Sequence, residues 1–565
     1  MQWLKEWSMS RSFLSVLFRC ASALLVCAMS IGVAQRQGGA ITVLLPEDLS
    51  TMNPYLTTAL ITLQVTPAIL EPLVGVDPEG QYYPILAREV PTIDNGGVSE
   101  DGLIITWRLR DDVLWSDGTP LTADDVVFTY EAAVNAESGS VRVGAFSTIE
   151  SIQAIDTHTV EIRYREFNSS YLDQFQWGIL PRHAAGEPSA MANWPFNRNP
   201  VGTGPFRLSE WRTGDRIILE RNPIYREAGK PYLDRLVFMV VPSQETRALM
   251  MTRGDAEVML WPGPEMRDVL EAAANVRVEL APSIWIMRLF LNLGERGNPT
   301  EAQAPHPILG DVRVRQALAL GIDYDLIIDD LAEGRVRRAH SPFELGWYAC
   351  ELEGYSYDPE RAAALLEEAG WVKGTDGIRV AQGAMYAEDG TRLSLEILGY
   401  SDFRLLEQTQ LVIADLWRDL GIETSIRNVE QSILFSGWAD RSARHTGNFD
   451  LLIYDTGAGI NPQLHVFALL HSSQIPREEN SGVGGNYSRW ANARADALLE
   501  LAGRSPSLEE RRAAYCEVAT LLQDELPQIF LYQFQENHAT SVRLQGSVPN
   551  TWAGLVWNVA DWWLE

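Results

Sequence analysis

Cysteine is scarce in this chain, with four residues in 565. Cys20 and Cys27 lie in an N-terminal segment that we expect to be removed, so Cys350 and Cys516 would remain in a mature protein. These two could pair, but their separation along the chain says nothing about their distance in space. Because Cys516 lies on the apolar side of a helical pattern, we favour a buried, unreactive thiol at this position.

Basic residues are fewer than acidic residues. Lys and Arg together number 46 against 75 Asp and Glu, which gives a formal net charge of −29. A surface of this sign repels phosphate backbones and argues against a nucleic-acid partner. The hydrophobic content of 46% is ordinary for a globular protein. The length corresponds to about three or four domain-sized units.

Long apolar runs are absent except near the N-terminus. There, Cys20–Val33 is a run of 14 residues without charge, preceded by Arg11 and Arg19 and followed by the small residue Ala34. This pattern predicts a secretory signal peptide over residues 1–34. The run is shorter than the roughly 20 residues of a membrane-spanning helix, although an uncleaved anchor is the alternative. We therefore expect an exported protein, periplasmic or extracellular.

Two further alternatives concern the same segment. Lipid attachment usually needs a small residue directly before the modified cysteine, but Arg19 precedes Cys20 and Val26 precedes Cys27. A lipoprotein is therefore disfavoured. Met9 is an alternative start of the protein, because the residues before it fit a signal sequence poorly.

Motifs for catalysis and metal binding are missing as well. The chain has no Gly-x-Ser-x-Gly elbow and no His-Glu-x-x-His pair. Among its eight histidines, His465 and His471 lie six apart, which is not the spacing of a helical metal pair. We expect no catalytic residues, no metal ligands and no cofactor, with a secreted hydrolase as the remote alternative.

The best-patterned segment is residues 96–131. Apolar residues alternate with others from Leu103 to Leu109, which predicts a half-buried strand. Asp, Gly and Pro then supply turn chemistry. Thr122, followed three residues later by Asp125, predicts the capped start of a helix.

This segment contains ITWRLRDDVLWSDGTPLTADDVVFTYEAA and resembles the hallmark segment of the bacterial extracellular solute-binding proteins of family 5. These are the oligopeptide-, dipeptide- and nickel-binding components of ABC importers. Four other segments, residues 63–90, 199–227, 311–331 and 358–371, are similar to the same family. The resemblance covers nearly all of the mature chain.

Gly202-Thr203-Gly204 within the second of these segments could suggest a phosphate-binding loop. However, neither a Lys-Ser/Thr pair nor a third glycine follows at the required spacing. We therefore interpret Gly202 and Gly204 as positions where the backbone approaches a neighbouring segment closely.

Strands alternate with helices along most of the chain, which indicates an α/β class. The resemblance implies a two-lobed periplasmic-binding-protein-like fold of class II. Lobe I would span residues 35–288, with an extra subdomain at about 91–200, and lobe II would span 289–531. Residues 532–565 would return to lobe I. Two extended runs, 285–293 and 529–534, would cross between the lobes.

The resemblance also implies a function: capture of a short peptide or similar solute between the lobes and its delivery to a membrane permease. The expected protein is a monomer, associated with the membrane through the ABC transporter permease subunits. An oligosaccharide ligand is the main alternative, and a metal complex is a weaker one.

One departure from the family pattern concerns the ligand. Peptide-binding relatives carry Trp, two residues and Asp after a Tyr-Asp strand, and this Asp pairs with the α-amino group of the ligand. Alignment on Asp450 places Thr456 at the Trp and Gly459 at the Asp. Asp455 would replace the missing carboxylate only if strand alternation aims it toward the ligand.

The candidate ligand-binding residues follow from these comparisons and from the 18 Trp and 18 Tyr of the chain, whose rings suit planar or apolar ligands. The alternative is that most of these aromatic residues are core residues. Our candidates are Asn53, Tyr55, Trp285, Trp347, Trp438, Thr456, Gly457, Gly459 and Asn461.

Overall fold

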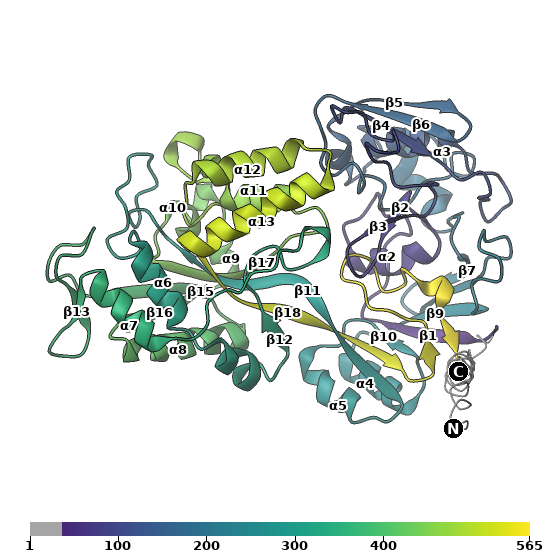
Figure 1. The fold of residues 1–565 in the computed structure, drawn as a ribbon. Helices are drawn as coiled ribbons and strands as arrows, with labels where there is room; N and C mark the ends of the chain where they lie inside the picture. The colour runs from purple at the N-terminus through teal and green to yellow at the C-terminus, as the bar shows by residue number, and fades with distance from the viewer. Residues whose placement is uncertain (1–36) are drawn as a thin grey trace, which may run out of the picture.

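The computed structural model describes residues 37–565, so the predicted signal peptide over residues 1–34 lies outside the described part of the chain. The main element is a mixed sheet of 11 strands (Figure 1). In spatial order its strands are β16 (Glu423–Val429), β15 (Ser394–Tyr400), β17 (Leu451–Gly457), β11 (Val276–Leu291), β18 (Gln528–Ser541), β10 (Val258–Met259), β1 (Ala40–Leu45), β9 (Arg235–Val240), β8 (Arg216–Arg221) and β7 (Phe206–Arg212), with β12 (Val336–Arg338) paired to β18.

Two long strands, β11 and β18, hold the halves of this sheet together. They run antiparallel to each other, with a register shift between Pro282 and Ile286. On one side, β17 pairs with β11 and continues into the parallel strands β15 and β16. On the other side, β10 pairs with β18 and continues into the parallel strands β1 and β9. The polypeptide therefore crosses between the halves as two hydrogen-bonded strands.

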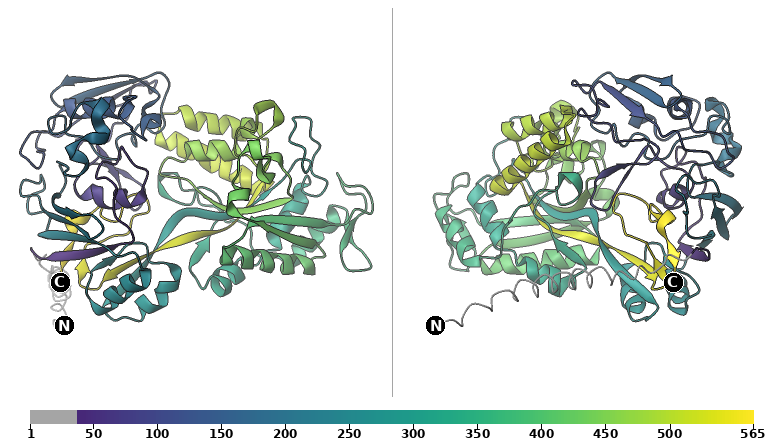
Figure 2. Two further views of the ribbon diagram at one scale, coloured as in Figure 1. Left: turned by 180° about the vertical axis from the view of Figure 1, so that it is seen from behind. Right: turned by 45° about the vertical axis from the view of Figure 1, so that its right-hand side comes forward.

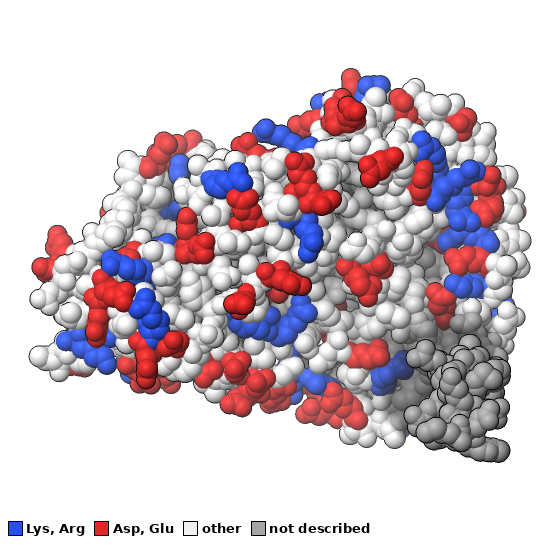
Figure 3. Space-filling view, viewed as in Figure 1, with Lys and Arg blue, Asp and Glu red and all other residues white. Residues whose placement is uncertain are grey.

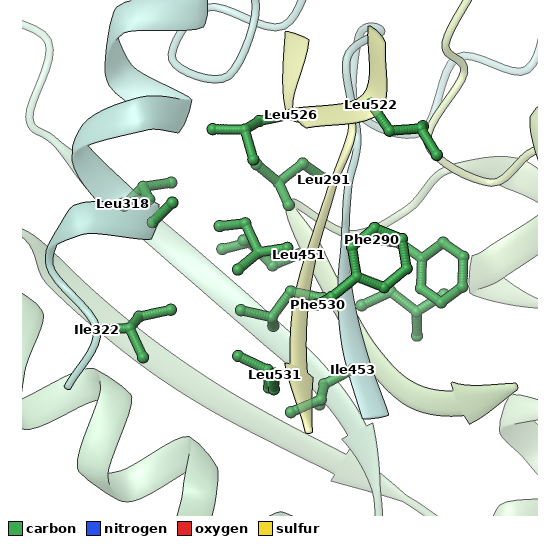
Figure 4. Close-up of a cluster of buried hydrophobic side chains, with 14 of the residues drawn as sticks. Phe290, Leu291, Leu318, Ile322, Leu451, Ile453, Leu522, Leu526, Phe530 and Leu531 are labelled. Carbon is green, nitrogen blue, oxygen red and sulfur yellow. The ribbon is translucent and has the colours of Figure 1, made fainter. Parts of the chain in front are cut away.

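Each half has its own large hydrophobic core. One core gathers buried residues between 41 and 260 together with residues between 544 and 562, and the other gathers buried residues between 286 and 532. Figure 4 shows part of the second core, where Phe290, Leu451 and Phe530 from three neighbouring strands meet Leu318 and Leu522 from helices. We call the two halves the first and the second lobe. The predicted α/β, two-lobed fold is confirmed.

Helices flank the sheet of the second lobe on both faces. Helices α11–α13 lie on one face and α6–α8 on the other (Figures 1 and 2). The helices are α2 (Leu60–Val65), α3 (Ala123–Val134), α4 (Gln244–Arg253), α5 (Arg267–Glu271), α6 (Val312–Leu320), α7 (Pro359–Glu368), α8 (Arg404–Asp419), α9 (Gln431–Leu434), α10 (Ala443–Thr446), α11 (Gln463–Leu470), α12 (Ala493–Arg504) and α13 (Leu508–Glu525). A π-helix covers Leu326–Leu331.

Smaller sheets complete the chain. They are β2 (Val74–Val76) with β3 (Tyr82–Pro84), β4 (Ile104–Arg108) with β6 (Thr159–Tyr164) and β5 (Ile149–Asp156), β13 (Trp371–Lys373) with β14 (Arg379–Ala381), and β19 (Leu544–Gln545) with β20 (Trp563–Leu564). The predicted strand, turn and capped helix are confirmed by β4 and α3. Asp125 accepts a hydrogen bond from the Thr122 backbone N–H at 2.9 Å, which closes the predicted capping box.

The C-terminal segment packs in the first lobe, because Leu544, Val556 and Trp562 belong to its core. The predicted lobe boundaries at 288/289 and 531/532 fall inside β11 and β18, which run through both halves. These boundaries, and that of the subdomain at about 91–200, remain predictions.

The two glycines at 202 and 204 lie against the backbone of residues 68–69. A Cβ added at Gly202 would lie 1.9 Å from the Ile69 carbonyl oxygen, and one at Gly204 would lie 2.7 Å from the Ala68 carbonyl oxygen. The Gly204 backbone N–H donates to Ile69 O at 2.8 Å. The interpretation of a close backbone approach is confirmed.

The two remaining cysteines form a disulfide bond, Cys350–Cys516, with Cα atoms 5.4 Å apart. The predicted unreactive thiol at Cys516 is therefore wrong. The helical pattern placed Cys516 correctly on α13, but it could not show that the loop carrying Cys350 packs against this helix. The bond closes a loop between residues separated by 166 positions, which restricts the unfolded chain.

Charged residues of both signs are interspersed on the face shown in Figure 3, over both lobes. Within residues 37–565, no helix combines the length and the apolar character that a membrane crossing requires.

Candidate functional site

A cavity of about 700 Å³ lies at the carboxyl ends of the parallel strands β15, β16 and β17. This edge of a parallel sheet is where open α/β sheets bind their ligands, because the loops that follow the strands diverge there. The residues that line the cavity are Trp285, Tyr400, Ser401, Asp402, Phe403, Glu430, Gln431, Ser432, Asp455 and Phe534.

Both crossing strands contribute to the wall of this cavity. Trp285 lies on β11, next to the register shift, and pairs with Gly457 of β17. Its side chain is 46% exposed, which is unusual for Trp. Phe534 comes from β18. The cavity therefore adjoins the two strands that connect the lobes.

The aromatic side chains form one continuous wall. The rings of Tyr400 and Phe403 are stacked with centroids 6.0 Å apart and an interplanar angle of 7°. Phe403 in turn lies 5.9 Å from Phe534. Such rings offer an apolar surface with a negative face.

Asp455 is aimed at the cavity by strand alternation. It pairs with Met287 across β17 and β11, whereas the next pair, Tyr454 and Arg288, points to the opposite face of the sheet. The Tyr400 hydroxyl donates to Asp455 Oδ1 at 2.9 Å. Burial and then the Asp455 carboxylate raise the pKa of Tyr400 above its usual range. Tyr400 therefore stays a protonated donor that orients this carboxylate.

Two of the sequence candidates, Asn53 and Tyr55, are fully buried in the first lobe. Asn53 Nδ2 donates to Asn197 Oδ1 at 3.0 Å, and the Tyr55 hydroxyl donates to the Gly178 carbonyl oxygen at 2.8 Å. Their polar atoms hold loops together, and neither residue lines the cavity.

The two other tryptophan candidates are also away from it. Trp347 is 7% exposed, and its Nε1 donates to the Ile460 carbonyl oxygen at 2.7 Å. Trp438 packs against Gly482, and the Arg441 guanidinium lies 5.0 Å from its ring centroid. Trp285 is the tryptophan that the structure brings to the cavity.

Thr456 and Gly457 lie at the end of β17. Thr456 is buried on the face opposite to Asp455, with its Oγ1 3.3 Å from His465 Nε2. A Cβ at Gly457 would lie 2.9 Å from the Ile284 carbonyl oxygen, so a larger residue would disturb the pairing with β11.

Gly459 and Asn461 follow in the next loop. Gly459 is exposed, and a Cβ there would meet no atom within 4 Å, so the position has room for a side chain. The Tyr348 hydroxyl donates to its carbonyl oxygen at 2.9 Å. Asn461 reaches the first lobe, where its Nδ2 donates to Ser170 Oγ at 2.7 Å.

A second cavity of about 190 Å³ lies between β2, β3 and the C-terminal segment, and Ile460 of the second lobe reaches it. Burial raises the pKa of Asp173 on its wall to about 6, although the Tyr82 hydroxyl donates to this carboxylate at 2.8 Å. This cavity is small and mostly apolar, so we assign the principal site to the larger one.

Sequence reasoning missed most of the cavity wall. Tyr400, Phe403, Glu430 and Phe534 were not selected because no motif marks them. The available signal is positional: β15, β16 and β17 lie side by side, and the carboxyl ends of parallel strands share one edge. Among residues 37–565, no group of three or more His, Cys, Asp or Glu could hold a metal ion.

The family model described as "Bacterial extracellular solute-binding proteins, family 5 Middle" matches residues 81–476 of this chain. The match spans more than half of the chain and includes every cavity residue from Trp285 to Asp455. The chain belongs to this family of binding proteins.

Individual relatives are distant. The chain is 26% identical to the oligopeptide-binding protein AppA of Bacillus subtilis over 490 residues, which cover 85% of this chain and 83% of that protein. It is 28% identical to the nickel-binding periplasmic protein of Escherichia coli over 527 residues, which cover 91% and 92%.

A solved structure shows the same fold. The ABC transporter substrate-binding protein CtaP of Listeria monocytogenes superposes with a TM-score of 0.71 at 22% identity, covering 94% of this chain and 100% of that chain. The two-lobed architecture is therefore shared at low sequence identity.

Proposed function

We propose that this chain is the extracytoplasmic substrate-binding component of an ABC importer, which captures a short peptide or similar solute between its lobes. Membership of family 5 supports the binding role. The observation that carries the location of the ligand is the cavity at the ends of β15–β17, walled by Trp285 and Phe534 from the crossing strands. A solute in this cavity would touch both the second lobe and the connection between the lobes.

The proposed mechanism is closure of the lobes about β11 and β18. A ligand that contacts both lobes favours the closed state, because only this state offers both sets of contacts. The register shift near Pro282 supports a hinge at this place, since it interrupts the regular pairing of the two strands. The permease would then recognise the closed shape.

The remaining parts of the proposal follow from this role. The protein works outside the cytoplasm as a monomer, associates with the membrane through the permease subunits, and performs no chemistry on its ligand. The lining residues Asp402, Glu430 and Asp455 serve binding, and the Tyr400 hydroxyl that donates to Asp455 keeps its proton because its pKa is raised.

An oligosaccharide is the second candidate ligand. The stacked rings of Tyr400 and Phe403 beside Trp285 favour it, since flat sugar faces pack well on aromatic rings. Carboxylates would accept hydrogen bonds from sugar hydroxyl groups.

Titration calorimetry of the purified protein against short peptides and oligosaccharides tests the proposal. We expect one of the two classes to bind, to raise the melting temperature and to reduce the radius of gyration measured by small-angle scattering. An unchanged scattering curve on binding would contradict lobe closure. Absence of binding by both classes would contradict the assigned ligands.

A further inference from the structure

The geometry points to a cationic organic solute as the ligand of this cavity, with Asp455 as the residue that holds its positive charge. This inference rests on the proposed function, because it names the chemical class of the captured solute. Asp455 lies on β17 and lines the cavity, whereas Gly459 lies in the loop that follows this strand and does not line it.

The charges of the cavity wall all have the same sign. Three of the ten lining residues, Asp402, Glu430 and Asp455, are carboxylates, and none of the ten is Lys, Arg or His. Within residues 37–565, none of the three carboxylates forms a salt bridge with a basic residue. A ligand entering the cavity therefore meets negative charge that no salt bridge on the cavity wall neutralises.

The buried cation Arg288 feels the charge of Asp455 but forms no salt bridge with it. Arg288 points to the other face of the sheet from Asp455. Its guanidinium donates to the Thr456 carbonyl oxygen at 3.1 Å and to Gln528 Oε1 at 3.3 Å. Arg288 is fully buried there and does not line the cavity.

The aromatic wall supports the same ligand class. Trp285, Phe403 and Phe534 line the cavity together with the carboxylates. Ring faces carry partial negative charge and attract ammonium and guanidinium groups that lie over them. Their apolar surface also accepts the hydrocarbon part of an amphipathic cation, such as a lysine or arginine side chain.

The charge of the solute decides whether closure of the lobes over Asp455 is favourable. Asp455 is already half-buried, and its Oδ1 has one neutral donor, the Tyr400 hydroxyl. Closing over a neutral solute would remove water from this carboxylate without replacing its charge, which is costly. Closing over an ammonium or guanidinium group replaces the water by a charge-assisted hydrogen bond. An anionic solute would be repelled.

The test compares probes of different charge on the full-length purified protein. The probes are the tripeptide Ala-Lys-Ala, the tripeptide Ala-Met-Ala, its N-acetylated form, which has no positive group, and the neutral sugar maltotriose. The variant Asp455→Asn keeps the shape and the acceptor for Tyr400 but removes the charge. Asp440→Asn, at an exposed acidic residue outside the cavity wall, is the matched control.

We expect Ala-Lys-Ala to bind most tightly and the acetylated peptide most weakly. The Asp455→Asn substitution should lower the affinity for Ala-Lys-Ala by about 10- to 100-fold, which is the effect expected from losing a hydrogen bond to a charged group. The affinity of the acetylated peptide should not change, and Asp440→Asn should match the unmodified protein. Added salt should lower the affinity for Ala-Lys-Ala more than the affinity for the acetylated peptide.

Two results would overturn the inference while the proposed function stands. One is binding of the acetylated peptide or of maltotriose as tightly as Ala-Lys-Ala. The other is an unchanged affinity for Ala-Lys-Ala in a folded Asp455→Asn variant, with folding checked by its melting curve. If none of the four probes binds, the inference and the assigned ligand classes fail together.

Discussion

Asn461 Nδ2 donates a hydrogen bond to Ser170 Oγ across 2.7 Å, and this contact joins the second lobe to the first. Arg511 of α13 supports the contact, because its guanidinium donates to Asn461 Oδ1 at 2.9 Å and to the Ser169 carbonyl oxygen at 3.1 Å. The same guanidinium lies 4.9 Å from the ring centroid of Trp347. The lobes are thus held together away from the cavity, by groups that do not line it.

Replacing Ser169 and Ser170 together by Ala removes both hydroxyl groups that face Asn461. We expect the free protein to open, because a hydrogen bond of this kind contributes about 1 kcal/mol, which shifts a two-state equilibrium about fivefold. Small-angle scattering of the protein without ligand measures this as a larger radius of gyration. Ser151→Ala, on the exposed strand β5, is the control. Equal scattering of both variants would show that the contact does not bias the lobes.

Restoring a carboxylate at position 459 should recruit peptides by their α-amino group. Gly459→Asp is expected to fold normally, since a Cβ there meets no atom within 4 Å. It should bind Ala-Met-Ala about tenfold more tightly than the unmodified protein, as one charge-assisted hydrogen bond would give. The acetylated peptide should show no gain.

Gly457→Asp serves as the positional control for that experiment. Its Cβ would lie 2.9 Å from the Ile284 carbonyl oxygen, so this variant should melt at a lower temperature than Gly459→Asp. Equal melting temperatures would contradict the close pairing of β17 with β11 at this point.

His465 makes stability depend on pH. Burial, and then the charge of Arg288, lower the pKa of this imidazole to about 4, against about 6.5 in an unfolded chain. Between these values the unfolded state binds the extra proton, so stability is complete above pH 6.5 and falls as the pH falls toward 4.

The variant His465→Gln should lose this contribution. Between pH 7.5 and pH 5, the free energy of unfolding of the unmodified protein should fall by about 2 kcal/mol more than that of the variant. Urea unfolding at the two pH values measures the difference. The partly exposed His158 in the β5–β6 turn provides the variant His158→Gln, which controls for the loss of an imidazole elsewhere in the chain. An identical slope in His465→Gln would contradict a neutral, buried imidazole.

Gly202 tests the close approach of two backbone segments. Gly202→Ala would bring a Cβ to 1.9 Å from the Ile69 carbonyl oxygen, so the segments must move apart. We expect a loss of about 2–3 kcal/mol in the free energy of unfolding. Gly144→Ala, where a Cβ meets no atom within 4 Å, should change it by no more than about 0.5 kcal/mol. A loss of similar size in both variants would point to glycine flexibility instead.

Much of the fold could be predicted because its signals are local. The capping pair Thr122 and Asp125 marks the start of α3, and the apolar alternation before it marks β4. Asp358 before Pro359 marks α7 in the same way. Each of these signals lies within a few residues of the element that it predicts, so a single sequence contains it whole.

The disulfide and most of the cavity could not be predicted for the opposite reason. Cys350 meets Cys516 only because a loop of the second lobe packs on α13. Asn53 and Tyr55 are residue types that often contact ligands, yet their polar atoms form hydrogen bonds inside the first lobe. The partner of each of these side chains comes from a segment that is distant in sequence, and no local sequence pattern identifies that segment.

The sequence by itself determined the family, the α/β class and the absence of a carboxylate at Gly459, because each of these depends on residue identity at fixed spacing along the chain. Only the tertiary structure decided that Asp455 faces the same cavity as Trp285 and Phe534. The physical reason is that β11, β17 and β18 bring these three side chains together through pairing between strands that are remote in sequence, and the direction of each side chain depends on the register of that pairing.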